Sequence, residues 1–137
     1  MKKLTVEANI DNLDAVVDFV NGELEYKNYP PELLININLA VEEIFMNIAH
    51  HAYCPGNGSV AIAISVGDET VIRFEDTGKP YNPLERPDPD LDKSLMERAI
   101  GGLGIFLVKQ VMDQVDYIRI DNKNVLTVTK KFAEPTA

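Results

Sequence analysis

Several features on which other classes of protein depend are missing from this sequence. It holds a single cysteine, Cys54, so no internal disulfide can form, as expected for a protein of the reducing cytoplasm. No apolar run is long enough to span a bilayer. The opening Met1-Lys2-Lys3 is not followed by the apolar core of a signal peptide. We therefore expect a cytoplasmic protein that does not enter a membrane.

Basic residues are also scarce. The chain has 13 Lys and Arg against 22 Asp and Glu, which gives a net charge of −9. Nucleic acids and anionic membranes are polyanions and repel such a protein, so a basic protein is a more suitable partner. With 137 residues, 45% of them hydrophobic, the sequence predicts a single domain over residues 1–137.

Alternation, helical periodicity and turn residues divide the chain into strands and helices. The sequence predicts a strand at 4–8, a helix opening near Asn9 or Asp11, a helix at 31–53, strands at 59–66 and 70–75, a helix from about 105 to 112, and strands at 115–120 and 125–129. The proline-rich residues 80–101 form a long loop, a kind of segment that is often functional. The expected fold class is α+β. It is a two-layer sandwich whose mixed, mostly antiparallel sheet is covered on one face by helices.

The helix at 31–53 carries a polar pair at the edge of its apolar stripe. Glu43 and Asn47 are one turn apart and share one face. Such a pair is costly beside a core unless it has partners. An amide oxygen suits Mg²⁺, which keeps several waters and takes further ligands from substrate phosphates. A carboxylate one turn away suits a proton acceptor. The alternative is an ordinary solvated helix edge.

Two further motifs lie beyond this helix. Asp76-Thr77-Gly78 ends a strand, where the carboxylate can accept a hydrogen bond from an exocyclic amine such as that of adenine. The alternative is an ordinary turn. The run from Gly101 to Gly104 opens the next helix, whose N–H groups and positive dipole end suit an anion. The alternative is a flexible junction. The run is neither a Walker A loop nor a Rossmann fingerprint, because it follows a loop and no Lys-Ser/Thr pair follows it.

Taken together and in this order, the motifs Glu43-x-x-x-Asn47, Asp76-x-Gly78 and Gly102-x-Gly104 resemble the nucleotide-binding boxes of the GHKL ATP-binding superfamily. That superfamily includes gyrase, heat-shock chaperone, histidine-kinase and mismatch-repair ATPases. The chain is similar, over nearly its whole length, to the stand-alone anti-sigma-factor serine kinases of the RsbW and SpoIIAB type. It shares their Glu-x-x-x-Asn-x-x-x-His-x-Tyr pattern, which ends here at Tyr53, and the Gly-Leu-Gly-Ile-Phe-Leu-Val sequence from Gly102. No dimerisation helices with a phosphoacceptor histidine precede the domain, so we do not expect a sensor histidine kinase.

The resemblance implies a role for each motif. Asn47 would hold Mg²⁺ against the triphosphate, and Glu43 would be the general base for an incoming serine hydroxyl. Asp76 would bind the adenine amine, directly and through water, with Gly78 close to the base. His51 would pack near the nucleotide as a structural residue.

The remaining implied contacts lie later in the chain. The phosphates would lie against Gly101, Gly102, Leu103 and Gly104, with residues 80–101 as a lid. Arg98, in this lid, is a candidate for pairing with phosphate charge. Either Thr127 or Thr129 would help to hold the water of the adenine site.

The resemblance therefore implies an ATP- and Mg²⁺-dependent serine-protein kinase that acts as an anti-sigma regulatory factor, with ADP as the nucleotide left after transfer. Its partners would be an antagonist protein of the STAS type, which it phosphorylates, a sigma factor, or both. A homodimer is a further expected assembly. Two alternatives stay open: a nucleotide-binding partner-switch module without significant kinase activity, and a structural domain with vestigial boxes.

Overall fold

A computed structural model of the chain describes residues 1–25, 27–53, 56–85 and 103–132. Its elements, in order, are β1 (Lys2–Glu7), the 3-10 turn η1 (Ile10–Asn12), α1 (Leu13–Leu24), α2 (Pro31–His51), β2 (Ser59–Val66), β3 (Glu69–Asp76), the 3-10 turn η2 (Pro83–Glu85), α4 (Leu103–Val111), β4 (Gln114–Ile120) and β5 (Lys123–Lys131). The order of strands and helices is the one that the sequence predicts. Asn9 caps the first turn by accepting a hydrogen bond from the Asp11 N–H, and Pro31 occupies the first turn of α2, where its missing N–H costs little.

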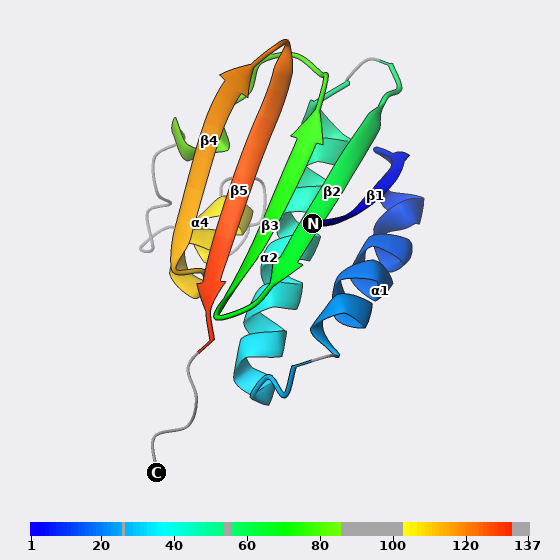
Figure 1. Cartoon of the computed structure of the whole chain (residues 1–137). Coiled ribbons are helices and arrows are strands. Elements are labelled where there is room, and N and C mark those ends of the chain that lie inside the picture. Colours follow the sequence, from blue (N-terminus) through cyan, green and yellow to red (C-terminus); the bar gives the residue numbers. More distant parts are fainter. Residues whose placement is uncertain (26, 54–55, 86–102, 133–137) are drawn as a thin grey trace.

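The strands form one sheet in the order β1-β2-β3-β5-β4 (Figure 1). Every pairing among the described strands is antiparallel, so the expected mixture of parallel and antiparallel pairs is not found there. The pairing of β3 with β5 joins strands that are not neighbours in sequence. It places Asp76, the last residue of β3, directly opposite Asn124 of β5.

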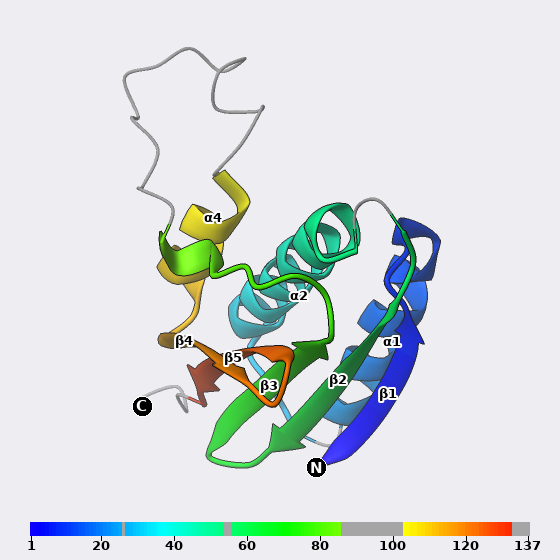
Figure 2. The same cartoon turned by 90° about the horizontal axis from the view of Figure 1, so that it is seen from above.

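The helices cover one face of this sheet, which gives two layers (Figure 2). The buried core lies between the layers. Val16 and Val20 of α1 and Ile44 and Phe45 of α2 are fully buried there. They pack against the helix-facing side chains of the strands, among them Val60, Ile62, Ile72, Phe74, Leu126 and Val128. The helical period of α2 and the alternation in the strands are therefore satisfied by the same core. None of the helices in the described part of the chain is long and apolar enough to cross a membrane.

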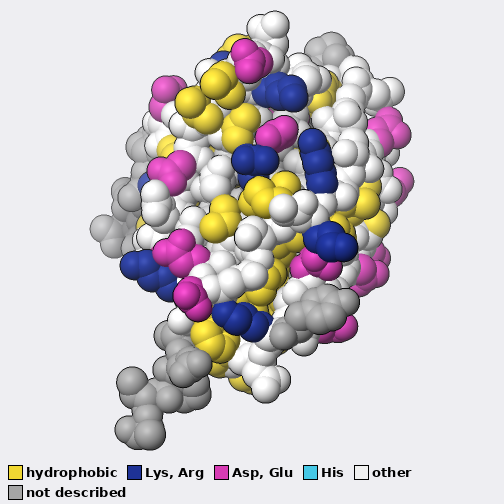
Figure 3. All heavy atoms as spheres, viewed as in Figure 1, with side chains coloured by type: hydrophobic (Ala, Val, Ile, Leu, Met, Phe, Trp, Pro, Cys, Tyr) yellow, Lys and Arg dark blue, Asp and Glu magenta, His cyan; other side chains and the backbone are white. Residues whose placement is uncertain are grey.

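No helix among the described residues covers the opposite face of the sheet, and Figure 3 shows hydrophobic and charged side chains interspersed across it. Arg73 and Glu75 of β3 belong to this open face and form an ion pair of 3.0 Å. Thr127 lies opposite Arg73, and Thr129 is two residues further along the same strand. Because successive side chains of a strand point to opposite faces, both threonines face away from the helices. The expectation that one of them faces an adenine site is therefore wrong.

A tight turn sets the register of the last hairpin. Asp121 and Asn122 have φ angles of 52° and 62°, which lie in the left-handed region that Asp and Asn tolerate better than most residues. Two such residues in succession form the primed turn that matches the twist of a hairpin. The register that results puts Asn124 on the helix-facing side together with Leu126 and Val128.

Candidate functional site

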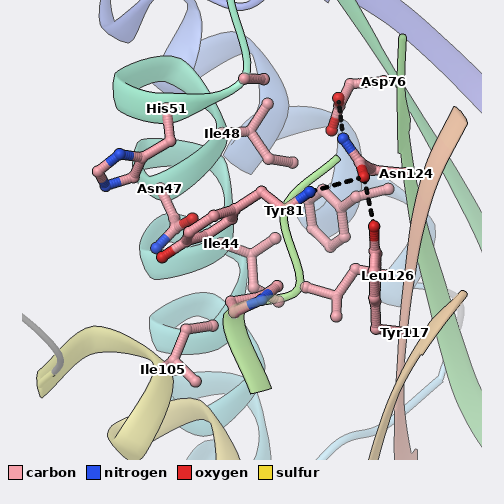
Figure 4. A pocket seen from close by; sticks show the side chains of 13 residues that line it. Ile44, Asn47, Ile48, His51, Asp76, Tyr81, Ile105, Tyr117, Asn124 and Leu126 are labelled. Carbon is pink, nitrogen blue, oxygen red and sulfur yellow. Dashed lines mark hydrogen bonds between the residues drawn. The ribbon is translucent and has the colours of Figure 1, made fainter. Parts of the chain in front are cut away.

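A cavity lies between α2 and the ends of β3 and β5 (Figure 4). Its walls are mostly apolar, with polar groups at a few points, which is the usual make-up of a small-molecule site. The apolar lining comes from Ile44, Ile48, Ala52, Phe74, Pro83, Ile105 and Leu126, and the polar lining from Asn47, His51, Asp76, Tyr81, Tyr117 and Asn124. The water-accessible volume is about 30 Å³, room for about two water molecules. A ligand the size of a purine therefore requires a side chain of the lining to move.

Asp76 presents a carboxylate to this cavity from the end of β3. The residue is 5% exposed. Its Oδ1 accepts hydrogen bonds from the Gly78 N–H and from Asn124 Nδ2, both at 2.9 Å. Its Oδ2 accepts none from the residues that the structure describes. Since Asp76 lines the cavity, this oxygen can accept a hydrogen bond from a ligand that brings its own donor.

The turn after Asp76 is held against the end of α2. The Tyr53 hydroxyl accepts a hydrogen bond from the Thr77 N–H at 2.8 Å and donates one to the Ser59 carbonyl at 2.6 Å. The Lys79 N–H donates to the Ala52 carbonyl at 3.0 Å. A Cβ on Gly78 would collide with that same carbonyl. The packing of the turn on α2 therefore requires a glycine at position 78, whether or not a nucleobase lies close to it.

Glu43 lies outside the cavity and against the first turn of α4, whereas Asn47, one turn further along α2, lines the cavity. A Cβ on Gly104 would stand 2.5 Å from Glu43 Oε2. The carboxylate of Glu43 therefore takes the space that the glycine leaves open. Burial, and secondarily the neighbouring charge of Glu42, raise the pKa of Glu43 above its ordinary value. A carboxylate with a raised pKa is a stronger base, as proton transfer requires.

Tyr81 closes the cavity on the side of His51. The two rings are stacked, with 5.3 Å between centroids and 22° between planes. Figure 4 shows the Tyr81 side chain extending from the strand side toward α2. The sequence gives no sign of this contact, since Tyr81 stands among the prolines of the loop. His51 lines the cavity, and its packing near a nucleotide stays a prediction.

Asn124 is the second lining residue that the sequence did not indicate. Its neighbours Asp121, Asn122 and Lys123 make the segment read as a plain turn. The sequence signal for Asn124 is its spacing from Leu126 and Val128, because residues two and four apart along a strand lie on the same face. A polar residue at a buried position of that pattern needs partners, and here these include Asp76.

The remaining predicted residues are placed only in part. Arg98, Gly101, Gly102 and most of the predicted lid lie outside the described residues, and Leu103 is the first residue of α4. Among the described residues no group of three or more His, Cys, Asp or Glu side chains could hold a metal. Asn47 fits Mg²⁺ nonetheless, because that ion takes few protein ligands and completes its shell with water and substrate phosphates.

The chain is similar in sequence to a known domain family and to known proteins. The sequence profile of the histidine kinase-like ATPase domain matches residues 6–130. The serine/threonine-protein kinase BtrW of Bordetella bronchiseptica is 32% identical over 104 residues, which cover 74% of this chain and 72% of BtrW. The serine-protein kinase RsbW of Halalkalibacterium halodurans is 29% identical over 133 residues, which cover 93% of this chain and 81% of that protein.

A solved structure shares the fold. It holds the RsbU and RsbW domains of Rv1364c from Mycobacterium tuberculosis, and it matches 99% of this chain with a TM-score of 0.63 and 15% sequence identity. This chain spans 34% of the length of that one. The profile match covers nearly all of the described strands and helices, including those that carry Glu43, Asn47 and Asp76. The chain therefore belongs to the histidine kinase-like ATPase domain family.

Proposed function

We propose that this protein is an ATP- and Mg²⁺-dependent serine-protein kinase that works as a partner switch in anti-sigma regulation. One observation carries the proposal: a mostly apolar cavity has the free Oδ2 of Asp76 at one end and Asn47 at the other, with Glu43 one turn from Asn47. This arrangement suits a nucleobase at the Asp76 end of the cavity and a metal-bound phosphate chain at the Asn47 end, with Glu43 beside the phosphates as a proton acceptor. The curated relatives BtrW and RsbW carry the names of serine/threonine- and serine-protein kinases, which supports a protein serine as acceptor.

At the base end, Asp76 Oδ2 accepts a hydrogen bond from the amino group of adenine. The flat ring lies among the side chains of Ile44, Ile48 and Leu126, which line the cavity. Tyr81 has to move from its position over the cavity before the ring can enter, because the volume inside is too small for it. Burial of an aromatic base on apolar side chains supplies affinity, and the single carboxylate supplies orientation.

At the phosphate end, Asn47 would hold Mg²⁺ through its amide oxygen. When bound, the ion neutralises charge on the phosphates as the phosphoryl group transfers. The first N–H groups of α4, beginning at Leu103 and Gly104, face the same end and offer hydrogen bonds to phosphate oxygens. We assign Gly101, Gly102 and Arg98 to the same phosphate contacts. Residues 80–101 would form the lid of the site, and the whole chain would be one ATP-binding domain.

Glu43 is the proposed general base. Its carboxylate lies at the N-terminal turn of α4, one helical turn from Asn47 on α2. A serine hydroxyl brought to this point loses its proton to Glu43 as its oxygen attacks the terminal phosphorus of ATP. The bond between that phosphorus and the bridging oxygen breaks, and ADP leaves with the bridging oxygen. The raised pKa of Glu43 favours acceptance of that proton.

The partners follow from the same proposal. We propose that the phosphorylated protein is a STAS-type antagonist, that a sigma factor is the alternative partner, and that the kinase can form a homodimer. Such a switch works in the cytoplasm, where ATP is available and Cys54 stays reduced. The net charge of −9 favours a partner whose contact surface is basic.

Phosphotransfer to a purified STAS-domain protein, captured with this chain from the source cell, tests the proposal. The protein is incubated with ATP labelled in the terminal phosphate and with Mg²⁺, and serine phosphorylation is followed by mass spectrometry. We expect transfer by the native protein and a loss of about 100-fold or more in Glu43→Ala, with nucleotide binding retained.

Two results would contradict this. A native protein that binds ATP but phosphorylates no captured protein is not a kinase. A Glu43→Ala variant that regulates its partner as well as the native protein indicates the alternative, a nucleotide-binding partner-switch module without significant kinase activity. The matched control is Glu32→Ala, which removes an exposed carboxylate from the first turn of the same helix and should transfer phosphate at close to the native rate.

A further inference from the structure

Asn124 is a buried amide whose hydrogen-bonding capacity is fully used. The residue is 6% exposed. Its Nδ2 donates to Asp76 Oδ1 at 2.9 Å and to the Lys79 carbonyl at 2.8 Å. Its Oδ1 accepts from the Tyr81 N–H at 3.2 Å and from the Tyr117 hydroxyl. An asparagine side chain has two donors and an oxygen with two lone pairs, so none of its capacity is left over.

These four partners fix which way the amide points. If nitrogen and oxygen were exchanged, the oxygen would face Asp76 Oδ1 and the Lys79 carbonyl, which are both acceptors. The NH₂ group would then face the Tyr81 N–H, which is a donor. Only the observed orientation satisfies every group, and so the donating edge of Asn124 faces Asp76.

The consequence for Asp76 is that its two oxygens have different tasks. Oδ1 receives two donors, the Gly78 N–H and Asn124 Nδ2. Rotation of the carboxylate would break both bonds. Oδ2 is therefore held toward the cavity, as an acceptor for whatever lies there.

We propose that Asn124 is a positioning residue that determines the base specificity of this site: by holding Asp76 Oδ1, it makes Oδ2 a fixed acceptor that selects purines with an exocyclic amino group, as in adenine, over purines with a carbonyl group in the same place, as in hypoxanthine. The proposal rests on the nucleotide site of the proposed function and names the residue that sets its selectivity. It assigns Asn124 no direct contact with the nucleotide.

The chemical reason is the pairing of donors with acceptors in a cavity from which water is displaced. The amino group of adenine donates to Asp76 Oδ2. The carbonyl group of hypoxanthine would face it acceptor to acceptor and leave both groups unpaired. An unpaired buried polar group of this kind reduces affinity by roughly 10- to 100-fold. A site built to pair with one polar group is effective at rejecting an analogue that lacks it.

Asn124→Asp separates this role from a merely structural one. The substitution keeps the shape of the side chain and the acceptors for Tyr81 and Tyr117, but it removes the donors to Asp76 and to the Lys79 carbonyl. Two carboxylates facing each other repel or share a proton, so Asp76 no longer offers a fixed acceptor. The added negative charge lowers the affinity for all nucleotides alike. The ratio of the affinities for two nucleotides therefore reports on recognition of the nucleobase alone.

The measurement is calorimetric titration of the whole protein with ADP and with IDP in the presence of Mg²⁺. The native protein should prefer ADP by about 10-fold or more. In Asn124→Asp, and in Asn124→Ala, which removes the side chain without adding charge, the preference should fall close to equality. Thr127→Val, on the open face of the same strand, is the control and should keep the native ratio.

The outcomes are distinguishable. If the native protein prefers ADP and either folded Asn124 variant keeps that preference, the assignment to Asn124 is overturned while the nucleotide site stands. If the native protein binds ADP and IDP equally, Asp76 does not select the base and the assignment fails as well. If the native protein binds neither, the proposed function and this inference fail together.

Discussion

Gly104, in the first turn of α4, lies against the carboxylate of Glu43, and a Cβ on this residue would stand 2.5 Å from Glu43 Oε2. The atom that a Cβ would meet is the far end of a flexible side chain, so Gly104→Ala should displace Glu43 and leave the fold intact. Displacement of a general base by about 1 Å lowers turnover by about 100-fold. We expect a fall of roughly that size in the kcat of phosphotransfer, with a much smaller change in the dissociation constant of ADP.

Gly22→Ala is the matched control for this substitution. Gly22 lies within α1, and a Cβ there would meet nothing within 4 Å. An alanine in the interior of a helix stabilises the protein by about 0.5–1 kcal/mol relative to glycine, so this variant should unfold at higher urea and transfer phosphate at the native rate. Native turnover by Gly104→Ala would mean that the observed position of Glu43 is not the reactive one.

The pKa of Glu43 predicts how phosphotransfer depends on pH. Its pKa is raised by burial and then by the charge of Glu42, so the carboxyl keeps its proton to a higher pH than an ordinary glutamate, whose pKa is 4.5. A protonated base cannot accept a proton, so kcat/KM should rise with pH as Glu43 ionises. Glu42→Gln removes the repulsion that favours the protonated form. In this variant the rise of kcat/KM should therefore occur at lower pH, as measured in a stopped assay at constant ionic strength. If the pH midpoint of the rise were unchanged or shifted upward, Glu43 would be excluded as the titrating base.

At the scale of secondary structure, one tyrosine joins three elements at the site. The Tyr53 hydroxyl, just beyond α2, binds Thr77 after β3 and Ser59 at the start of β2. Its ring also packs where Gly58 has no side chain, since a Cβ on Gly58 would collide with it. The tyrosine of the Glu-x-x-x-Asn-x-x-x-His-x-Tyr pattern is thus explained by the turn that carries Asp76, and it needs no contact with a ligand.

Tyr53→Phe should therefore weaken both the fold and the binding of nucleotide. The variant loses the hydrogen bonds to Thr77 and Ser59, and we expect about 1 kcal/mol less stability in urea unfolding. The affinity for ADP should fall as well, because Thr77 separates Asp76 from Gly78. Thr77→Val is the control: it removes the weaker contact of the threonine hydroxyl with Tyr53, at 3.1 Å, and keeps the backbone bond. Equal effects from both variants would mean that the backbone bond does not position the turn.

The elements themselves could be predicted from the sequence, since each follows from local patterns. Pro31 opens α2, strand alternation marks β2, and the turn residues Asp121 and Asn122 mark the last hairpin. The pairing of β3 with β5 has no such local signal, because a whole helix and another strand separate them in sequence. The missed residue Asn124 is a direct consequence, since its role exists only through a partner, Asp76, across that pairing.

At the scale of the whole molecule, the same pairing explains the wrong expectation for Thr127 and Thr129. Threonine on a strand is equally suited to either face of a sheet, and only the register decides which face it occupies. The register of β5 follows from its pairing with β3 and β4 and from the core residues Leu126 and Val128. The three motifs could be located from sequence because their chemistry is local. The walls of the cavity between them could not, because α2, β3, α4, β4 and β5 all contribute side chains to it.

Because those elements meet at one cavity, nucleotide binding should stabilise the whole domain. A ligand at 100 times its dissociation constant adds about 2.7 kcal/mol to the free energy of unfolding, which raises the melting temperature by roughly 5–15 °C for a domain of this size. For the native protein we expect ADP with Mg²⁺ to give a larger rise than ADP with EDTA, since Asn47 lines the cavity and is the proposed ligand of the ion.

Asn47→Ala isolates the contribution of the metal. In this variant the rise in melting temperature with ADP and Mg²⁺ should equal the smaller rise with ADP and EDTA, because the base contacts at Asp76 are untouched. Asn36→Ala makes the same substitution near the other end of α2 and should keep the full native difference. If Asn47→Ala also keeps that difference, Mg²⁺ is bound without Asn47. If even the native protein gives equal rises with Mg²⁺ and EDTA, the ion contributes nothing to ADP binding, and its role must be sought with ATP, whose third phosphate offers it further oxygens.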